Sequence, residues 1–204
     1  MQAGANTREP LGAEDRRLLK DSPAIIGIDE VGRGALAGPV VVCGVRLSEI
    51  PNHDGIRDSK KLSQAKRSLA SLWVRQNSDA WVIVEVWPEV IDRVNILEST
   101  RRAMRTVVRS LSLPGDVVVV DAVSLGPGFE SVLSPIKADE HYFCVAAASN
   151  VAKVHRDGLM VDLAKIYPWW EWEKNKGYGT RNHRVGVAEH GLSCLHRRSF
   201  RCFR

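Results

Sequence analysis

The sequence predicts an α/β fold in which a mixed β-sheet is flanked by helices. Residues 117–120 are four consecutive valines, which is typical of a strand buried on both faces and therefore covered by helices. Apolar residues between Val90 and Leu111 recur at helical spacing. Segments of strand and helix character also alternate along the chain, although this pattern does not fix the order of the strands in the sheet.

The elements follow in order from periodicity and punctuation. Residues 1–22 mix Gly, Ala, Pro and charges without sustained apolar periodicity, so we expect a flexible leader. Short β-branched or alternating apolar runs predict strands at 24–29, 39–47, 81–86, 117–120 and 143–147. Helical periodicity after a capping residue or a proline predicts helices at 63–74, 88–111 and 149–166. Together these elements predict one domain with a core over 23–167.

The C-terminal segment, 168–204, is predicted to be a small helical and basic extension of the same domain. From Lys174 to Arg204 it carries eight Lys or Arg and one acid, Glu189, whereas the whole chain has a net charge of +5. Such a concentration of positive charge is expected of a surface that contacts phosphates. The arginines expected to make these contacts are Arg197, Arg198, Arg201 and Arg204.

Cysteine spacing and apolar run lengths predict a cytoplasmic protein without a membrane segment, and we expect it to be monomeric. The four cysteines form no CxxC pair, the N-terminus lacks the features of a secretory signal, and the longest apolar runs fall far short of a membrane helix. One zinc-compatible set does not have the spacing of a familiar finger, so packing or surface roles are favoured for it. Its members are His190, Cys194, His196 and Cys202.

Acidic residues at strand ends are the strongest chemical signal. Asp29 and Glu30 end an apolar strand, Asp121 follows the valine run directly, and Asp139 precedes a further apolar run. Any one of these acids alone would be read as a turn or capping residue. Four together could converge on hard divalent cations, which prefer oxygen ligands. Side chains of adjacent strand residues point to opposite faces, so Asp29 and Glu30 can share a site only if the strand ends or twists there.

Several blocks in order resemble the ribonuclease HII family, from about Ile25 to Phe200. The blocks are Gly27–Gly34 with Leu36–Val40, Asp58–Leu62, Asn95–Leu97, Val120–Asp121, Ala146–Asp157, Asn175–Thr180 and His196–Phe200. The resemblance implies a ribonuclease H-like fold over the catalytic core, with substrate binding in the C-terminal extension. It also implies an endonuclease that acts on RNA/DNA hybrids and cuts on the 5′ side of ribonucleotides in duplex DNA.

The resemblance also assigns roles to residues. It implies that Asp29, Glu30, Asp121 and Asp139 hold two Mg²⁺ or Mn²⁺ ions for hydrolysis. It implies that Gly32, Arg33 and Gly34, together with Tyr178, recognise the junction between a ribonucleotide and the following deoxynucleotide. Lys60 and Lys61 match a block expected to contact the phosphate backbone, with solvated surface lysines as the alternative. Ser149 and Lys153, expected near a helix start, could hold phosphates or only cap the helix.

Two residues depart from the family's sequence pattern, and some residue roles and overall functions have alternatives. Ala35 stands where the family usually has proline, and Ala138 stands where glycine usually precedes the fourth acid. The tryptophans at 169, 170 and 172 could stack on nucleic acid or pack in the core. A nuclease of the ribonuclease HIII kind that prefers runs of RNA, and a catalytically silent duplex-binding protein, are the other functions considered.

Overall fold

The computed structural model describes residues 10–51, 56 and 63–201. Its sheet has four strands, β1 (Ile25–Val31), β2 (Val40–Leu47), β3 (Ala80–Val86) and β4 (Val117–Val120), in the order β3-β2-β1-β4. The first three are antiparallel neighbours, while β1 and β4 run parallel. The predicted mixed sheet is therefore confirmed, and its four strands begin and end within two residues of the predicted bounds.

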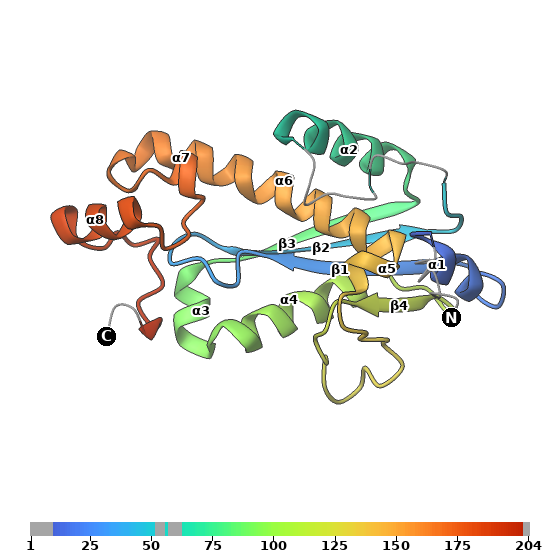
Figure 1. Cartoon of the computed structure of the whole chain (residues 1–204). Coiled ribbons are helices and arrows are strands. Elements are labelled where there is room, and N and C mark those ends of the chain that lie inside the picture. Colours follow the sequence, from blue (N-terminus) through green and yellow to red (C-terminus); the bar gives the residue numbers. More distant parts are fainter. Residues whose placement is uncertain (1–9, 52–55, 57–62, 202–204) are drawn as a thin grey trace, which may run out of the picture.

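Helices cover both faces of the sheet, as Figure 1 shows. On one face lie α2 (Gln64–Asn77) and the long α6 (Phe143–Ile166), and on the other α4 (Ile96–Leu111). Alternation along β1 divides the core accordingly, because Ile25 packs with α6 whereas Ile26 and Ile28 pack with α4. A Cβ at Gly27 would overlap the backbone of Cys144, so glycine there lets α6 approach β1 closely.

The C-terminal extension forms a small helical layer at one end of the sheet (Figure 1). It contains a 3₁₀ turn, η2 (Pro168–Trp170), and the helices α7 (Trp172–Asn175) and α8 (Arg181–His190). Trp170 and Trp172 are buried in a cluster with Met160 and Ala37, while Trp169 is exposed. The core role is thus confirmed for two of the three tryptophans.

Three predictions of secondary structure are wrong. The apolar run 143–147 is the start of α6 rather than a strand, so Ser149 lies inside the helix and does not cap it. The predicted helix over 88–111 is two helices, α3 (Pro88–Val94) and α4. Asn95 separates them in a left-handed conformation (φ 71°), and its Oδ1 accepts from the backbone N–H of Glu98 at 3.0 Å.

The third error concerns the leader. Within the described part of residues 1–22, α1 (Ala13–Leu18) forms and fully buries Asp15. The carboxylate of Asp15 accepts from the backbone N–H groups of Phe143 and Cys144 at 2.8 and 2.9 Å. These donors open α6 and have no partner within the helix, so a residue 128 positions away caps it. Residues 10–22 are therefore a folded part of the domain.

A short helix, α5 (Ala138–His141), precedes α6 and completes the structure around the ends of β1 and β4. No helix in the described ranges combines the length and apolar character needed to cross a bilayer.

Candidate active site

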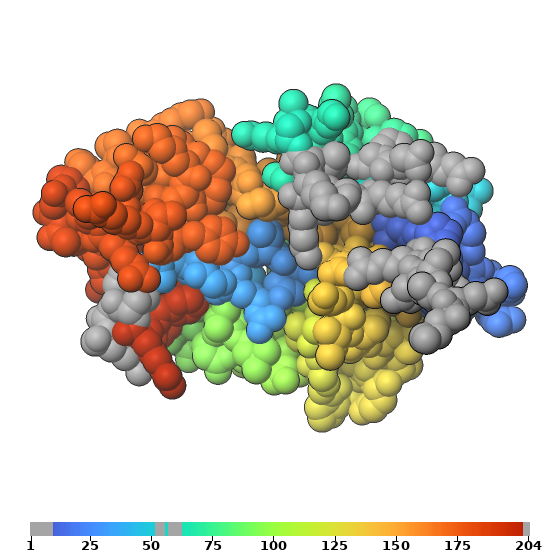
Figure 2. Space-filling view, in the orientation of Figure 1, coloured from blue at the N-terminus to red at the C-terminus, as the bar shows by residue number. Residues whose placement is uncertain are grey.

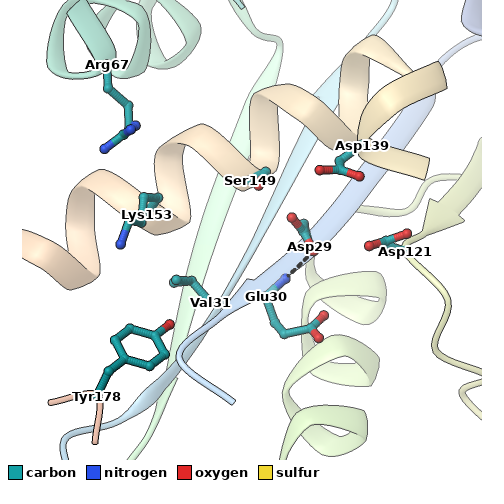
Figure 3. Close-up of a pocket in the computed structure, with 9 residues that line it drawn as sticks. All are labelled: Asp29, Glu30, Val31, Arg67, Asp121, Asp139, Ser149, Lys153 and Tyr178. Atoms are coloured by element: carbon teal, nitrogen blue, oxygen red, sulfur yellow. Dashed lines mark hydrogen bonds between the residues drawn. The ribbon is translucent and has the colours of Figure 1, made fainter. Parts of the chain in front are cut away.

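The four predicted acids line one cleft of about 430 Å³. Parallel pairing of β1 with β4 places Ile28 beside Val120, so the residues that follow them, Asp29 and Asp121, emerge at the same edge of the sheet. Glu30 follows on β1, and Asp139 reaches the cleft from α5 (Figure 3). In Figure 2 this region is a hollow in which the blue β1–β2 surface lies between the orange C-terminal extension and the yellow segment that precedes α6.

Asp29 and Glu30 do leave β1 in opposite directions, Asp29 toward α6 and Glu30 toward α4 (Figure 3). Both still line the cleft, because β1 ends at the following residue, Val31. The backbone N–H of Glu30 donates to Oδ1 of Asp29 at 2.8 Å, which fixes the first carboxylate against the strand. Asp29 and Glu30 can therefore share one site because the strand ends there, which is one of the two conditions expected from the sequence.

Burial and mutual repulsion dominate the electrostatics of the acids. Burial raises the pKa of Asp29 to about 8, and the charges of Glu30 and Asp121 add to this shift. Burial also raises the pKa of Glu30, although its ion pair with Arg33 opposes the change. Nη1 of Arg33 lies 2.9 Å from Oε1 of Glu30. Carboxylates in this setting gain from a cation placed among them.

The donor set suits a hard divalent cation. All four side chains offer oxygen, which Mg²⁺ and Mn²⁺ prefer. Oε2 of Glu30 is buried and has no hydrogen-bond partner within the described part of the chain, so it is available as a ligand. Among the described residues, no three Asp, Glu, His or Cys side chains stand close enough together to hold an ion in their present conformations. The acids would therefore have to turn toward a bound ion. Of the zinc-compatible set, Cys202 lies outside the described residues, and the ring of His196 packs against Trp170 and Trp172.

The path of the chain into Asp139 accommodates the alanine that replaces glycine. Lys137, not Ala138, takes the left-handed conformation (φ 58°) at the start of α5. The backbone N–H of Ala138 donates to Oδ1 of Asp121 at 2.8 Å. One candidate ligand thus anchors the short helix that carries another. Ala35 is likewise buried without a left-handed backbone, so an alanine fits there too.

The turn formed by Gly32, Arg33 and Gly34 lies next to the acids and is tied to the loop of Tyr178. Gly32 has φ 91°, a conformation that favours glycine, and Gly34 borders open space. The backbone N–H of Leu36 donates to the carbonyl of Gly177 at 2.8 Å, which links the segment after the turn to the residue before Tyr178. Tyr178 itself lines the cleft together with the acids (Figure 3).

Of the remaining predicted site residues, two line the cleft and two lie outside the described residues. Ser149 and Lys153 both line the cleft from α6, and Nζ of Lys153 pairs with Asp157 at 2.8 Å. Lys60 and Lys61 lie outside the described residues. Arg67 of α2 also lines the cleft and was not predicted, because nothing in its spacing separates it from the other basic residues of that helix.

One predicted phosphate contact is wrong. Arg197 is fully buried, and it donates through Nε to the carbonyl of Gly38 and through Nη1 to the carbonyl of Arg33. It therefore stabilises the turn instead of offering a surface charge. Arg198 and Arg201 are exposed, and Arg204 lies outside the described residues.

Comparison with known proteins identifies the family of the chain. A sequence model of the ribonuclease HII family matches residues 26–202. The ribonuclease HII of Rickettsia rickettsii (strain Sheila Smith) is 45% identical over 178 residues, which cover 87% of this chain and 91% of that protein.

Solved structures show the same fold. The ribonuclease H2 of Pyrococcus horikoshii OT3 has a TM-score of 0.75 and 25% identity, covering 89% of this chain and 95% of that one. The ribonuclease HII of Archaeoglobus fulgidus, solved in complex with PCNA, has a TM-score of 0.72 and 28% identity, covering 85% and 93%. These structures confirm the predicted ribonuclease H-like fold. The chain belongs to the ribonuclease HII family and is a nuclease, a hydrolase that acts on phosphodiester bonds.

Proposed function

We propose that this nuclease acts in the cytoplasm on the RNA-containing strand of RNA/DNA hybrids and cuts on the 5′ side of single ribonucleotides embedded in duplex DNA. The products would carry a 5′-phosphate and a 3′-hydroxyl. The observation that carries the proposal is the cleft that holds four carboxylates beside a glycine turn and a tyrosine ring. The acids supply a place for phosphodiester chemistry, and the turn and ring supply a way to distinguish RNA from DNA.

The metal ligands in this proposal are Asp29, Glu30, Asp121 and Asp139, with Mg²⁺ or Mn²⁺ as the ions. When bound, two such ions supply activation of the attacking water and stabilisation of the departing 3′ oxygen. The unpartnered Oε2 of Glu30 and the raised pKa of Asp29 support the assignment, because both groups gain a partner when a cation binds. Glu30 keeps Arg33 as its second partner, which orients its carboxylate.

Recognition of the ribonucleotide is assigned to Gly32, Arg33, Gly34 and Tyr178. Glycines let backbone amides approach the sugar and its 2′-hydroxyl, the group that separates RNA from DNA. The space beside Gly34 supports this role, since a Cβ built there would meet nothing within 4 Å. The ring of Tyr178 would stack on the deoxyribose that follows, where no hydroxyl stands in its way.

Phosphate binding is assigned to the α6 side of the cleft. Ser149 offers a hydroxyl and Lys153 an ammonium group from the same face of α6, and Arg67 faces them from α2 (Figure 3). A cation on each side would hold the strand along the cleft. Lys60 and Lys61 remain predicted phosphate contacts.

The test uses DNA duplexes that contain zero, one or four consecutive ribonucleotides in one strand. Each is incubated with the protein in Mg²⁺, in Mn²⁺ or in EDTA, and the cut position is mapped on a sequencing gel. We expect cleavage on the 5′ side of the single ribonucleotide with either metal and none in EDTA. Cleavage of the four-ribonucleotide duplex alone would indicate a nuclease that prefers RNA runs. Binding without cleavage in any metal would indicate a silent duplex-binding protein.

A further inference from the structure

Two arginines are buried completely beneath the Gly32–Gly34 turn. Arg156 of α6 and Arg197 of the C-terminal segment are both 0% exposed. In the described ranges neither is within ion-pair distance of a carboxylate, and every hydrogen bond that they donate goes to a backbone carbonyl. Burying a guanidinium without a carboxylate costs several kcal/mol, so an apolar side chain of similar volume would cost less. Their contribution must therefore lie in the carbonyls that they hold.

Arg156 connects the turn to the loop that carries Tyr178. Its Nε and Nη2 donate to the carbonyls of Pro39 and Ala37 at 2.9 and 3.1 Å, and Nη1 donates to the carbonyl of Lys176 at 2.9 Å. The guanidinium carbon also lies 5.4 Å from the centre of the Tyr178 ring. One side chain thus fixes the chain after the turn, the backbone before Tyr178 and the ring.

Arg156 also sets the conformation of the turn. A Cβ at Gly32 would overlap the guanidinium of Arg156, so the first glycine of the turn rests directly on this side chain. The contact requires glycine at a position where the backbone is already left-handed.

Arg197 holds the other end of the same segment. Its Nε donates to the carbonyl of Gly38 at 3.0 Å, and Nη1 donates to the carbonyl of Arg33 at 2.9 Å. The Arg33 carbonyl belongs to the peptide unit whose N–H is that of Gly34, so a charged donor on its oxygen polarises this N–H and strengthens it as a donor. The side chain of Arg33 meanwhile pairs with Glu30, which connects Arg197 to the acids through one residue.

We propose that Arg156 and Arg197 are positioning residues for substrate specificity, which hold the Gly32–Gly34 turn and the Tyr178 ring at the separation that reads one ribonucleotide followed by a deoxynucleotide. This inference rests on the proposed function. Recognition of a single junction needs the turn and the ring to engage adjacent sugars at once, so a shift between them is costly. A run of RNA offers a 2′-hydroxyl at each position and depends less on that separation.

The test compares Arg156→Lys and Arg197→Lys with the parent on two duplexes, one with a single ribonucleotide and one with four. Lysine keeps the charge but cannot reach several carbonyls as the guanidinium fork does. We expect kcat/KM on the single ribonucleotide to fall roughly 10- to 100-fold, as for displaced positioning groups in general. The loss on four ribonucleotides should be smaller by about 10-fold, and the Mg²⁺ concentration for half-maximal activity should stay within about twofold of the parent.

Met160→Leu is the matched control, because Met160 is buried beneath the same segment, against Gly38, but donates no hydrogen bond to it. This variant should retain the parental preference. If either lysine variant melts below the assay temperature, the other one decides. A folded lysine variant with the parental preference, or with equal losses on both duplexes that follow its melting temperature, would overturn the inference. A parent that fails to cut the single ribonucleotide would instead overturn the proposed function on which the inference rests.

Discussion

The Nε2 atoms of His183 and His196 lie 3.0 Å apart in the buried interior of the C-terminal extension. Nε2 of His183 also accepts from the indole N–H of Trp172 at 3.2 Å, so the proton between the two rings belongs to His196. Nδ1 of His183 then donates to the carbonyl of Tyr178, and Nδ1 of His196 accepts from the backbone N–H of Ser193. With both imidazoles neutral, every ring nitrogen has a hydrogen-bond partner.

This arrangement predicts that the two histidines lower the stability of the folded protein in mild acid. Burial lowers the pKa of His183, and burial with the charges of His183 and Arg198 lowers that of His196 to about 4, from an ordinary value of 6.5. The unfolded chain therefore binds more protons between pH 6.5 and pH 4. Their contribution to the free energy of unfolding should fall as the pH drops through this window, by up to about 3 kcal/mol from His196 alone. Urea denaturation at pH 7, 6 and 5 measures it.

Asp29 changes the free energy of unfolding with pH in the opposite direction, so its contribution must be removed to measure that of the histidines. Its pKa is raised to about 8, so the folded protein binds more protons than the unfolded chain between about pH 4 and pH 8 and gains stability as the pH falls. Between pH 7 and pH 5 this gain offsets the histidine loss in the parent, so the loss should become visible only in an Asp29→Asn background. Adding His196→Gln should flatten it again. Equal stability of Asp29→Asn at pH 7 and pH 5 would contradict the prediction.

We expect Asp29→Asn and Asp121→Asn each to reduce cleavage to well below roughly a tenth of the parent rate in saturating Mg²⁺, because each removes one anionic ligand. The fold should persist, since an asparagine oxygen can still accept from Glu30 or Ala138 as the carboxylate does. In EDTA at pH 7, Asp29→Asn should also raise the free energy of unfolding, by up to about 4 kcal/mol, because the folded parent must take up a proton at Asp29 that the unfolded chain does not hold at this pH.

Single-turnover cleavage and urea denaturation of the same preparations check both parts of this prediction. Glu89→Gln is the control, because Glu89 is an exposed acid of α3 that pairs with Arg93 on the same helix, and its removal should change neither quantity. Retained cleavage in either aspartate variant would remove that residue from the proposed ligand set.

Part of the site could be predicted from the sequence, namely the part in which the residue pattern of single strands and the pairing of those strands favour the same positions. The valine strand β4 and the apolar start of β1 both end in an aspartate, and parallel pairing of two such strands brings the acids together without further information. The capping residue Ser63 also accepts from Lys66 as its position predicts. In these places the local pattern and the tertiary structure require the same residues.

Long-range contacts explain what could not be predicted. The start of α6 carries no local capping signal, because its cap is Asp15, which only the folded chain brings to Phe143. Without that cap, the apolar run 143–147 is as consistent with a buried strand as with a buried helix. Arg197 was predicted to contact phosphate and Arg156 was given no role, since nothing in the sequence shows that their donors meet backbone carbonyls.

Asn150 on α6 predicts a gain in stability on substitution. It is fully buried, and neither its Nδ2 nor its Oδ1 has a hydrogen-bond partner among the residues that the structure describes. A buried unsatisfied amide costs about 1–3 kcal/mol, so Asn150→Leu, which has a similar volume, should raise the free energy of unfolding by about that amount. Asn150→Asp buries a charge instead and should lower it. A leucine variant less stable than the parent in urea denaturation would show that the amide is satisfied in solution.

The exposed charges of α8 predict the salt dependence of duplex binding. Arg181 and Arg184 are exposed beside Gly179, one residue from Tyr178, and border a hollow on that helix. Each phosphate contact contributes about 0.9 to the slope of log Kd against log salt. Fluorescence anisotropy titrations of Arg181→Gln with Arg184→Gln should therefore give a slope lower by about 1–2.

Arg102→Gln on α4 is the control for charge alone, because Arg102 is exposed and paired with Glu98. It should leave the slope unchanged, and a slope in the α8 double variant identical to that of the parent would show that α8 does not contact the duplex.

Truncation after Ser193 is a poorer test of the basic tail, since it removes the bonds of Arg197 to Gly38 and Arg33 along with the exposed charges. We expect such a truncation to change the turn as well as affinity.

Tyr178 provides the last prediction, which separates ring stacking from simple packing. If the ring stacks on the deoxyribose that follows the ribonucleotide, Tyr178→Phe should keep most activity. Tyr178→Ala should lose about 1–3 kcal/mol, or roughly 10- to 100-fold in cleavage of a single embedded ribonucleotide. The ring also covers the guanidinium of Arg156, so the alanine variant should melt at a lower temperature even if stacking is unimportant.

Stability and recognition are separated by measuring both variants on duplexes with one ribonucleotide and on an all-RNA strand, alongside melting temperatures and the Mg²⁺ dependence. Stacking at the junction predicts that Tyr178→Ala loses much more on the single ribonucleotide than on the all-RNA strand, with the Mg²⁺ requirement unchanged because the ring holds no metal. Packing alone predicts equal losses on both substrates, in proportion to the fall in melting temperature. An alanine variant that keeps the parental preference for the junction would exclude Tyr178 from recognition and leave the Gly32–Gly34 turn as the reader of the ribonucleotide.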